Sequence, residues 1–140
     1  MPQLHDALPT VIPLATPGRA AVVTGRILGG LSALFLLVDA AMKVVVIAPV
    51  IEACERLGWS GSLARPLGVL LAACTILFLV PRTRLLGGVL LTGYLGGAVA
   101  THVRVGDPFW FPIALGAILW ASITLTDARV RALVTRSPRS

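Results

Sequence analysis

The chain has 140 residues, of which 56% are hydrophobic and only 13% are charged. Soluble domains carry about 25% charged residues, so this chain has too little polar surface to cover a globule in water. The net charge is +6, but the basic residues form no Lys/Arg-rich run with interleaved aromatic residues. That distribution argues against a nucleic-acid partner, and the composition predicts an integral membrane protein.

The chain begins with a proline-rich stretch, residues 1–25, that shows no helical period and is expected to be a tail before the membrane. The first long apolar segment, residues 27–48, follows this tail. Roughly 20 apolar residues cross a hydrocarbon core of about 30 Å, so the segment is expected to span the membrane. Two charged residues, Asp39 and Lys43, lie inside it.

A short amphipathic segment follows the first span. Pro49 can open a helix and Gly58 can stop it. Between them, residues 50–57 place apolar side chains at helical spacing and include charged residues such as Glu55. This pattern is typical of a helix that lies on the membrane surface, and Trp59 is an expected interfacial anchor.

Three further apolar segments complete a predicted membrane domain over residues 26–126. They cover residues 63–80, 85–103 and 109–126, and residues 127–140 form a basic tail. Each segment is close to the length that crosses a bilayer as a helix. The predicted fold is therefore all-α: an integral membrane four-helix bundle with a short interfacial helix between the first two spans.

The basic residues are divided unevenly between the two sides of this bundle. One side carries Arg19, Arg26, Arg82, Arg84, Arg129, Arg131, Arg136 and Arg139. The other side carries Arg56, Arg65 and Arg104. Because basic loops stay in the cytoplasm, this asymmetry predicts that both termini are cytoplasmic.

Two features predict how the spans pack. The segments Arg26-Ile-Leu-Gly-Gly and Arg84-Leu-Leu-Gly-Gly open the first and third spans, and this weak repeat favours two parallel helical hairpins. Small residues let helix backbones approach closely in lipid. The third span carries such residues at four-residue spacing, namely Gly88, Thr92, Gly96 and Ala100.

The polar residues of the spans are expected to meet in the outer half of the membrane. Asp39 and Lys43 lie four residues apart and can pair on one helix face. At about 1.5 Å per residue, Asp39 lies about 20 Å and His102 about 25 Å from the cytoplasmic ends of their spans. A lone charge inside the bilayer costs at least about 2.5 kcal/mol, so these groups are expected to face protein or a wet cavity.

These polar residues are divided into candidate acid/base residues and candidate ligand-binding residues. The candidate acid/base groups are Asp39, Lys43 and His102, because an imidazole titrates near neutrality. The candidate ligand-binding residues are Arg104, Asp107 and Glu55, just above this level, and Tyr94, two helical turns below His102. The alternative interpretation is an internal ion pair with interfacial side chains that reach outward to water, in which Glu55 is simply solvated.

Metal and thiol chemistry find no support in the sequence. Cys54 and Cys74 form no C-x-x-C pair, and no His/Cys cluster has zinc spacing. Cys74 lies inside a span and is expected to be a small packing residue. We therefore predict no metal site, and the sequence indicates no particular cofactor.

Several segments give the chain a resemblance to the DoxX-like family of small bacterial four-span membrane proteins, over about residues 24–133. They are Arg26-Ile-Leu-Gly-Gly, Asp39-Ala-Ala-Met-Lys43, Pro66-Leu-Gly-Val-Leu and Leu91-Thr-Gly-Tyr-Leu-Gly-Gly-Ala-Val-Ala-Thr-His-Val-Arg104. The resemblance implies the four-span fold. The family's link to a thiosulfate:quinone oxidoreductase and to oxidative-stress complexes implies a quinone or redox-partner role, but it carries over no catalytic residues.

The leading hypothesis is a membrane protein that binds a lipophilic ligand, such as a quinone, in an outward-facing polar pocket as part of a redox complex. One alternative is a membrane enzyme that uses acid/base catalysis on a lipid-soluble substrate, as an isomerase, cyclase or epoxide-opening enzyme. Another is a structural membrane subunit. The expected partners are membrane lipids, the lipophilic molecule, a redox protein and a second copy of the chain. The expected location is the bacterial inner membrane.

Overall fold

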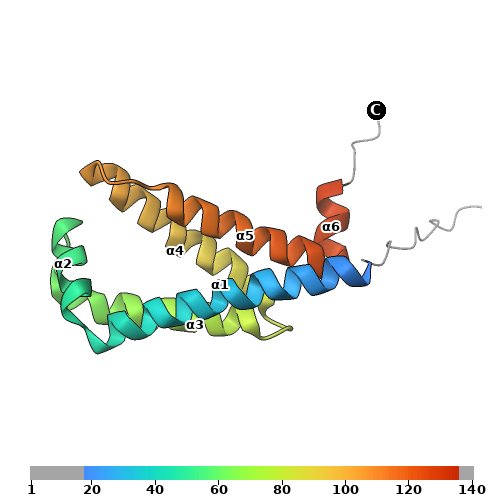
Figure 1. Ribbon diagram of the computed structural model, residues 1–140, viewed down its shortest axis with the longest axis horizontal. Coiled ribbons are helices and arrows are strands. Elements are labelled where there is room, and N and C mark those ends of the chain that lie inside the picture. Colours follow the sequence, from blue (N-terminus) through green and yellow to red (C-terminus); the bar gives the residue numbers. More distant parts are fainter. Residues whose placement is uncertain (1–17, 136–140) are drawn as a thin grey trace, which may run out of the picture.

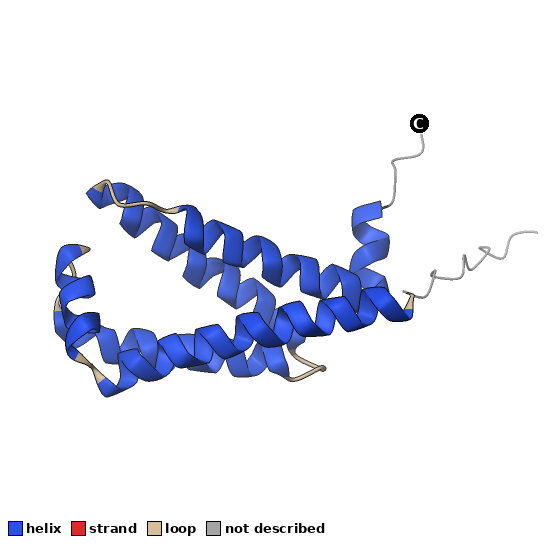
Figure 2. Cartoon of the chain, viewed as in Figure 1, coloured by secondary structure: helices blue, strands red, loops and turns tan. Residues whose placement is uncertain are grey.

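The computed structural model describes residues 18–135, and within this range it contains helices and loops but no strands (Figures 1 and 2). The four long helices are α1 (Arg19–Val45), α3 (Ala64–Leu79), α4 (Arg84–Val105) and α5 (Trp110–Thr126). The short ones are α2 (Ala48–Arg56), the 3-10 turn η2 (Gly61–Leu63) and α6 (Ala128–Thr135). The predicted all-α fold, including the short helix after the first span, is confirmed.

Three of these helical segments are long and apolar enough to cross a membrane, namely α1, η2 with α3, and α4. The helix α5 has 17 residues and passes the same test only when it is taken together with α6. The outer faces of the helices carry exposed large apolar side chains such as Leu31, Val38, Leu86 and Ile113. An apolar outer surface of this kind suits lipid, so the described chain is a bundle with three to four candidate membrane spans.

Local sequence explains where the helices end. Pro49 lies in the first turn of α2, where a backbone N–H has no hydrogen-bond acceptor within the helix, so its absence from proline removes no hydrogen bond. The residue before Pro81 is extended, with ψ of 121°, because a proline disfavours helical geometry in its predecessor. Gly58 and Gly106 follow α2 and α4 with φ of 74° and 73°, a region that glycine adopts without steric cost.

Two helices differ in extent from the sequence prediction. α1 begins at Arg19, so the last residues of the proposed tail 1–25 are helical, and residues 1–17 lie outside the described part. The predicted basic tail 127–140 contains α6, which bends away from α5 by 111°. The Asp127 carboxylate accepts a hydrogen bond from the Arg129 amide at 2.8 Å and so caps α6, a local signal that we overlooked.

The long helices form a ring in which α1 and α4 each pack against both α3 and α5. The hairpin of α1 with α3 therefore faces the hairpin of α4 with α5. Their shared core contains Leu36, Leu71, Phe78, Leu91, Leu119 and Ile123. The ring places the first and third spans diagonally opposite each other.

The two hairpins converge at one end and diverge at the other (Figure 1). We call the end near α6 the closed end and the end near α2 the open end. At the closed end a Cβ on Gly87 would lie 2.2 Å from the Phe78 amide nitrogen, so α3 and α4 touch there. The expected small-residue row of α4 is used only in part, because Gly88 is buried whereas a Cβ on Gly96 would meet no atom within 4 Å.

Candidate functional site

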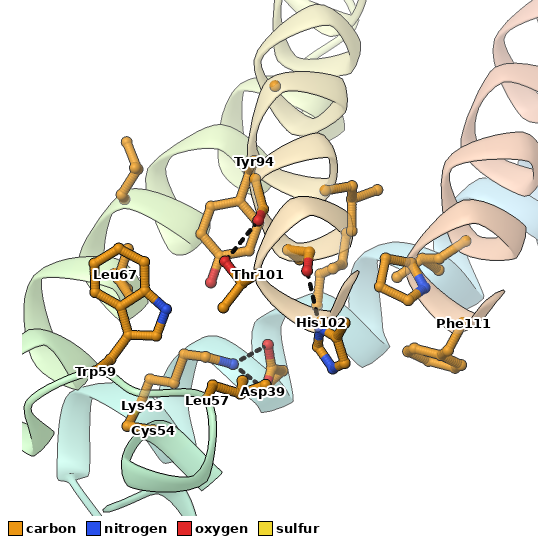
Figure 3. Close-up of a pocket in the computed structure, with 18 of the residues that line it drawn as sticks. Asp39, Lys43, Cys54, Leu57, Trp59, Leu67, Tyr94, Thr101, His102 and Phe111 are labelled. Atoms are coloured by element: carbon orange, nitrogen blue, oxygen red, sulfur yellow. Dashed lines mark hydrogen bonds and ion pairs between the residues drawn. The ribbon is translucent and has the colours of Figure 1, made fainter. Parts of the chain in front are cut away.

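A cavity of about 550 Å³ lies between the diverging hairpins at the open end, and α2 and the residues after it form part of its wall (Figure 3). Most of its wall is apolar, with Phe35, Leu36, Leu67, Leu95 and Leu115 among the lining side chains. Ligand pockets of about 300–1,000 Å³ typically combine an apolar wall with a few polar groups. This cavity has that character.

An ion pair on α1 supplies the charged groups of the cavity. The Lys43 ammonium donates hydrogen bonds to both carboxylate oxygens of Asp39, so the predicted pairing is confirmed. The two side chains line the cavity and remain 20% and 26% exposed, respectively. Since an ammonium has three donors and Asp39 takes two, one donor of Lys43 is left for a bound molecule.

His102 on α4 lines the same cavity and has a defined tautomer. Its Nδ1 lies 2.8 Å from the Ala98 carbonyl oxygen. A carbonyl oxygen can only accept a hydrogen bond, so Nδ1 carries the proton and the neutral ring has its lone pair on Nε2. The imidazole therefore offers the cavity an acceptor that can also act as a base.

Tyr94 and Thr101 complete the polar lining on α4. Within residues 18–135 the Tyr94 hydroxyl makes no hydrogen bond, although its ring is half-buried against the core. The Thr101 hydroxyl donates to the Gly97 carbonyl at 2.8 Å, which leaves its oxygen as an acceptor. Figure 3 shows Asp39 and Lys43 coming from α1 and Tyr94, Thr101 and His102 coming from α4.

The other predicted site residues lie outside the cavity wall. The Arg104 guanidinium donates to the Leu57 carbonyl at 2.7 Å and lies 5.5 Å from the ring of Trp59. Asp107 forms an ion pair with Arg56 at 3.7 Å. Arg104 and Asp107 thus fasten the end of α2 and the segment after it to the end of α4, and we call these contacts the clasp.

Glu55 stands apart from both groups. It is exposed, and it does not line the cavity. Cys54 and Leu57, on the same short helix and just after it, do line the cavity. The apolar face that the sequence assigned to the membrane surface therefore turns partly onto the bundle, and the amphipathic spacing of this segment was the only signal for that contact.

A second polar contact occupies the closed end. Arg84 reaches back into the bundle, donates to the Ser122 hydroxyl at 3.3 Å and lies 5.0 Å from the Phe78 ring. The sequence had assigned Arg84 only an orienting role in a basic turn. Among the described residues, no group of three His, Cys, Asp or Glu side chains could hold a metal ion.

Residues 27–122 match the model of the DoxX-like family. This chain belongs to the DoxX-like family. The match covers most of the bundle, including every polar group of the cavity, and stops before α6. Neither the curated proteins nor the solved structures contain a significant match to the chain. The family assignment from the sequence is confirmed.

Proposed function

We propose that this DoxX-like protein binds an amphiphilic ring compound, such as a quinone, in the cavity at the open end. The observation that carries the proposal is a largely apolar cavity that no side chain fills, with an ion pair, an imidazole and a phenol on its wall. A bundle with a purely structural role gains packing by filling such a space, since empty volume costs contacts. The cavity therefore favours binding over a structural role.

The polar groups suit both redox forms of a quinone. Carbonyl oxygens of the oxidised form can accept from Lys43 and from the Tyr94 hydroxyl. Hydroxyl groups of the reduced form can donate to Nε2 of His102. A redox-complex subunit needs a site that holds both forms, and this set of donors and acceptors supports that role.

The distribution of basic residues between the two ends indicates how the bundle is oriented in the membrane. The turn that carries Arg82 lies at the closed end, together with the start of α1 and with α6, whereas Arg56, Arg65 and Arg104 lie at the open end (Figure 1). With the closed end in the cytoplasm, the excess of basic residues is inside. We therefore propose that the cavity faces the outer side of a bacterial inner membrane.

Binding can be measured on the protein in lipid nanodiscs with decylubiquinone as the probe. Trp59 lines the cavity, so quinone binding should quench tryptophan fluorescence in a saturable way. Tyr94→Phe and His102→Ala each remove one polar partner and should raise the dissociation constant by about five- to tenfold, since a hydrogen bond contributes about 1 kcal/mol. Glu55→Gln, outside the cavity, is the matched control, and the absence of saturable quenching in the wild type would refute the proposal.

A second candidate function is acid/base catalysis on a lipid-soluble substrate. The fixed tautomer of His102 favours it, because a base on Nε2 lines the same cavity as the donors Lys43 and Tyr94. An epoxide-bearing fatty alcohol incubated with the protein should then gain water, detected by mass spectrometry. His102→Ala should abolish the conversion and Glu55→Gln should retain it; no conversion by the wild type would exclude this activity for epoxides.

A further inference from the structure

We infer that the ligand enters the cavity sideways from the lipid, through the seam between α3 and α4, and not from the water at the open end. The inference deepens the proposed function and depends on it for the identity of the ligand. Four residues of this seam both line the cavity and are exposed, namely Leu63, Leu70, Gly93 and Gly97. We call them the α3–α4 window.

The segment after α2 forms part of the water-facing rim of the cavity. Leu57 and Trp59 line the cavity from the segment after α2. Arg104 holds this segment through the Leu57 carbonyl at 2.7 Å and the Trp59 ring at 5.5 Å. The ion pair of Arg56 with Asp107 adds a second link at 3.7 Å, so two contacts hold this rim of the cavity in place.

The helices on both sides of α1 are in contact with it at the level of the cavity. Between α1 and α5, the rings of Phe35 and Phe111 meet edge to face with centroids 5.2 Å apart. Between α1 and α3, a Cβ on Gly68 would lie 2.7 Å from the Cβ of Lys43, so the backbones touch beside the ion pair. Both seams therefore have a close contact beside the cavity.

The helices α4 and α5 are in contact as well. The Trp120 indole donates to the Thr92 hydroxyl at 2.9 Å. A Cβ on Gly116 would be in ordinary contact with Leu95, at 3.7 Å. The window is different, because a Cβ on Gly93 or Gly97 would meet no atom within 4 Å.

The window restricts the class of ligand. A molecule that arrives from lipid must partition into the bilayer, and its polar head must reach Asp39, Lys43 and His102. Its apolar tail can remain between α3 and α4 and extend into the lipid, so the cavity volume limits the head and not the tail. The glycines matter because a side chain at either position would stand in this path.

The native thiol Cys54 reports on the route without any need for a bound quinone. Cys54 lines the cavity and is only 8% exposed. The full-length protein in liposomes would be treated with dodecyl maleimide dissolved in the lipid or with a sulfonated, membrane-impermeant maleimide in the water. Peptide mass spectrometry separates modification of Cys54 from that of Cys74. The lipid-dissolved reagent should modify Cys54 at least about tenfold faster, because access governs the reaction of a buried thiol.

Gly97→Leu should slow this lipid-side modification by about tenfold, since access limits the rate, and Gly93→Leu should act in the same direction. Gly96→Leu is the matched control: Gly96 is exposed on the same helix with open space around it, but it does not line the cavity. If the aqueous reagent modifies Cys54 as fast, or if Gly97→Leu behaves like Gly96→Leu, the lateral route is wrong. Decylubiquinone binding to the wild type, measured separately, then decides whether the proposed function survives.

Discussion

The Asp39–Lys43 pair allows a direct test of how much an ion pair inside a span stabilises the bundle. Asp39→Asn and Lys43→Met each leave a charged partner in a half-buried position on α1. Exposed pairs contribute about 0.2–1 kcal/mol, whereas breaking a fully buried pair costs about 3–5 kcal/mol. The two side chains are 26% and 20% exposed, so each single variant is expected to lose about 2–3 kcal/mol, between those limits.

The double variant Asp39→Asn/Lys43→Met removes both charges at once. It should recover about 1–2 kcal/mol relative to the sum of the single losses, because no unpaired charge remains. The assay is reversible unfolding of the protein from detergent micelles by added SDS, followed by circular dichroism. The free energy of unfolding is compared across all four proteins in the cycle.

A second cycle on Arg56→Met and Asp107→Asn is the matched control. This pair lies at the open end, with Arg56 71% exposed, and its coupling should be below about 1 kcal/mol. Strict additivity in the Asp39–Lys43 cycle would show that the two charges do not stabilise each other. A coupling energy no larger than that of the control pair would show that water screens the Asp39–Lys43 pair as strongly as a pair on the surface.

Three further predictions test the topology, the closed end and the clasp. With cysteines engineered at residues 82 and 106, an impermeant thiol reagent applied outside should label only residue 106; labelling of both from one side would refute the predicted spans. Gly87→Ala would press against the backbone of α3, 2.2 Å away, and should lose about 1–3 kcal/mol in SDS unfolding, whereas Gly96→Ala should not destabilise the protein. Arg104→Gln removes a cation–π contact of about 0.5–1 kcal/mol, so amide hydrogen exchange in α2 should accelerate about two- to fivefold, and an unchanged rate would show that the clasp does not hold α2.

The parts of the fold that depend on local sequence could be predicted. The apolar lengths, Pro49, Gly58 and Pro81 gave the number and approximate extent of the helices, because each acts on its own neighbourhood. The pairing of Asp39 with Lys43 followed from their spacing on one helix. The start of α1 at Arg19 was missed because the proline-rich stretch was taken to extend to residue 25, although its prolines end at Pro17. The helix α6 was missed because a basic segment was taken as a tail, although polar residues also form helices at a membrane surface.

The depth of the site residues in the membrane could be predicted, but the directions in which their side chains point could not. The rise per residue placed Asp39, His102 and Arg104 at one end of the bundle, which the structure bears out for the helices that carry them. It gave no information on which way a side chain turns, because that depends on the neighbouring helices. Arg104 turns toward Leu57 and Trp59, whereas His102 turns into the cavity.

The position of the cavity is explained by which glycines are in contact with a neighbouring helix. At the closed end, a Cβ on Gly25 would lie 2.8 Å from Leu125 and one on Gly87 2.2 Å from Phe78, so backbones touch there. At the open end, Gly93 and Gly97 touch nothing, and the hairpins stand apart. Helices that are close at one end and separated at the other enclose a wedge-shaped space. The cavity volume is therefore set partly by packing at the opposite end, and a substitution that separates the closed end should change ligand affinity without touching the ligand.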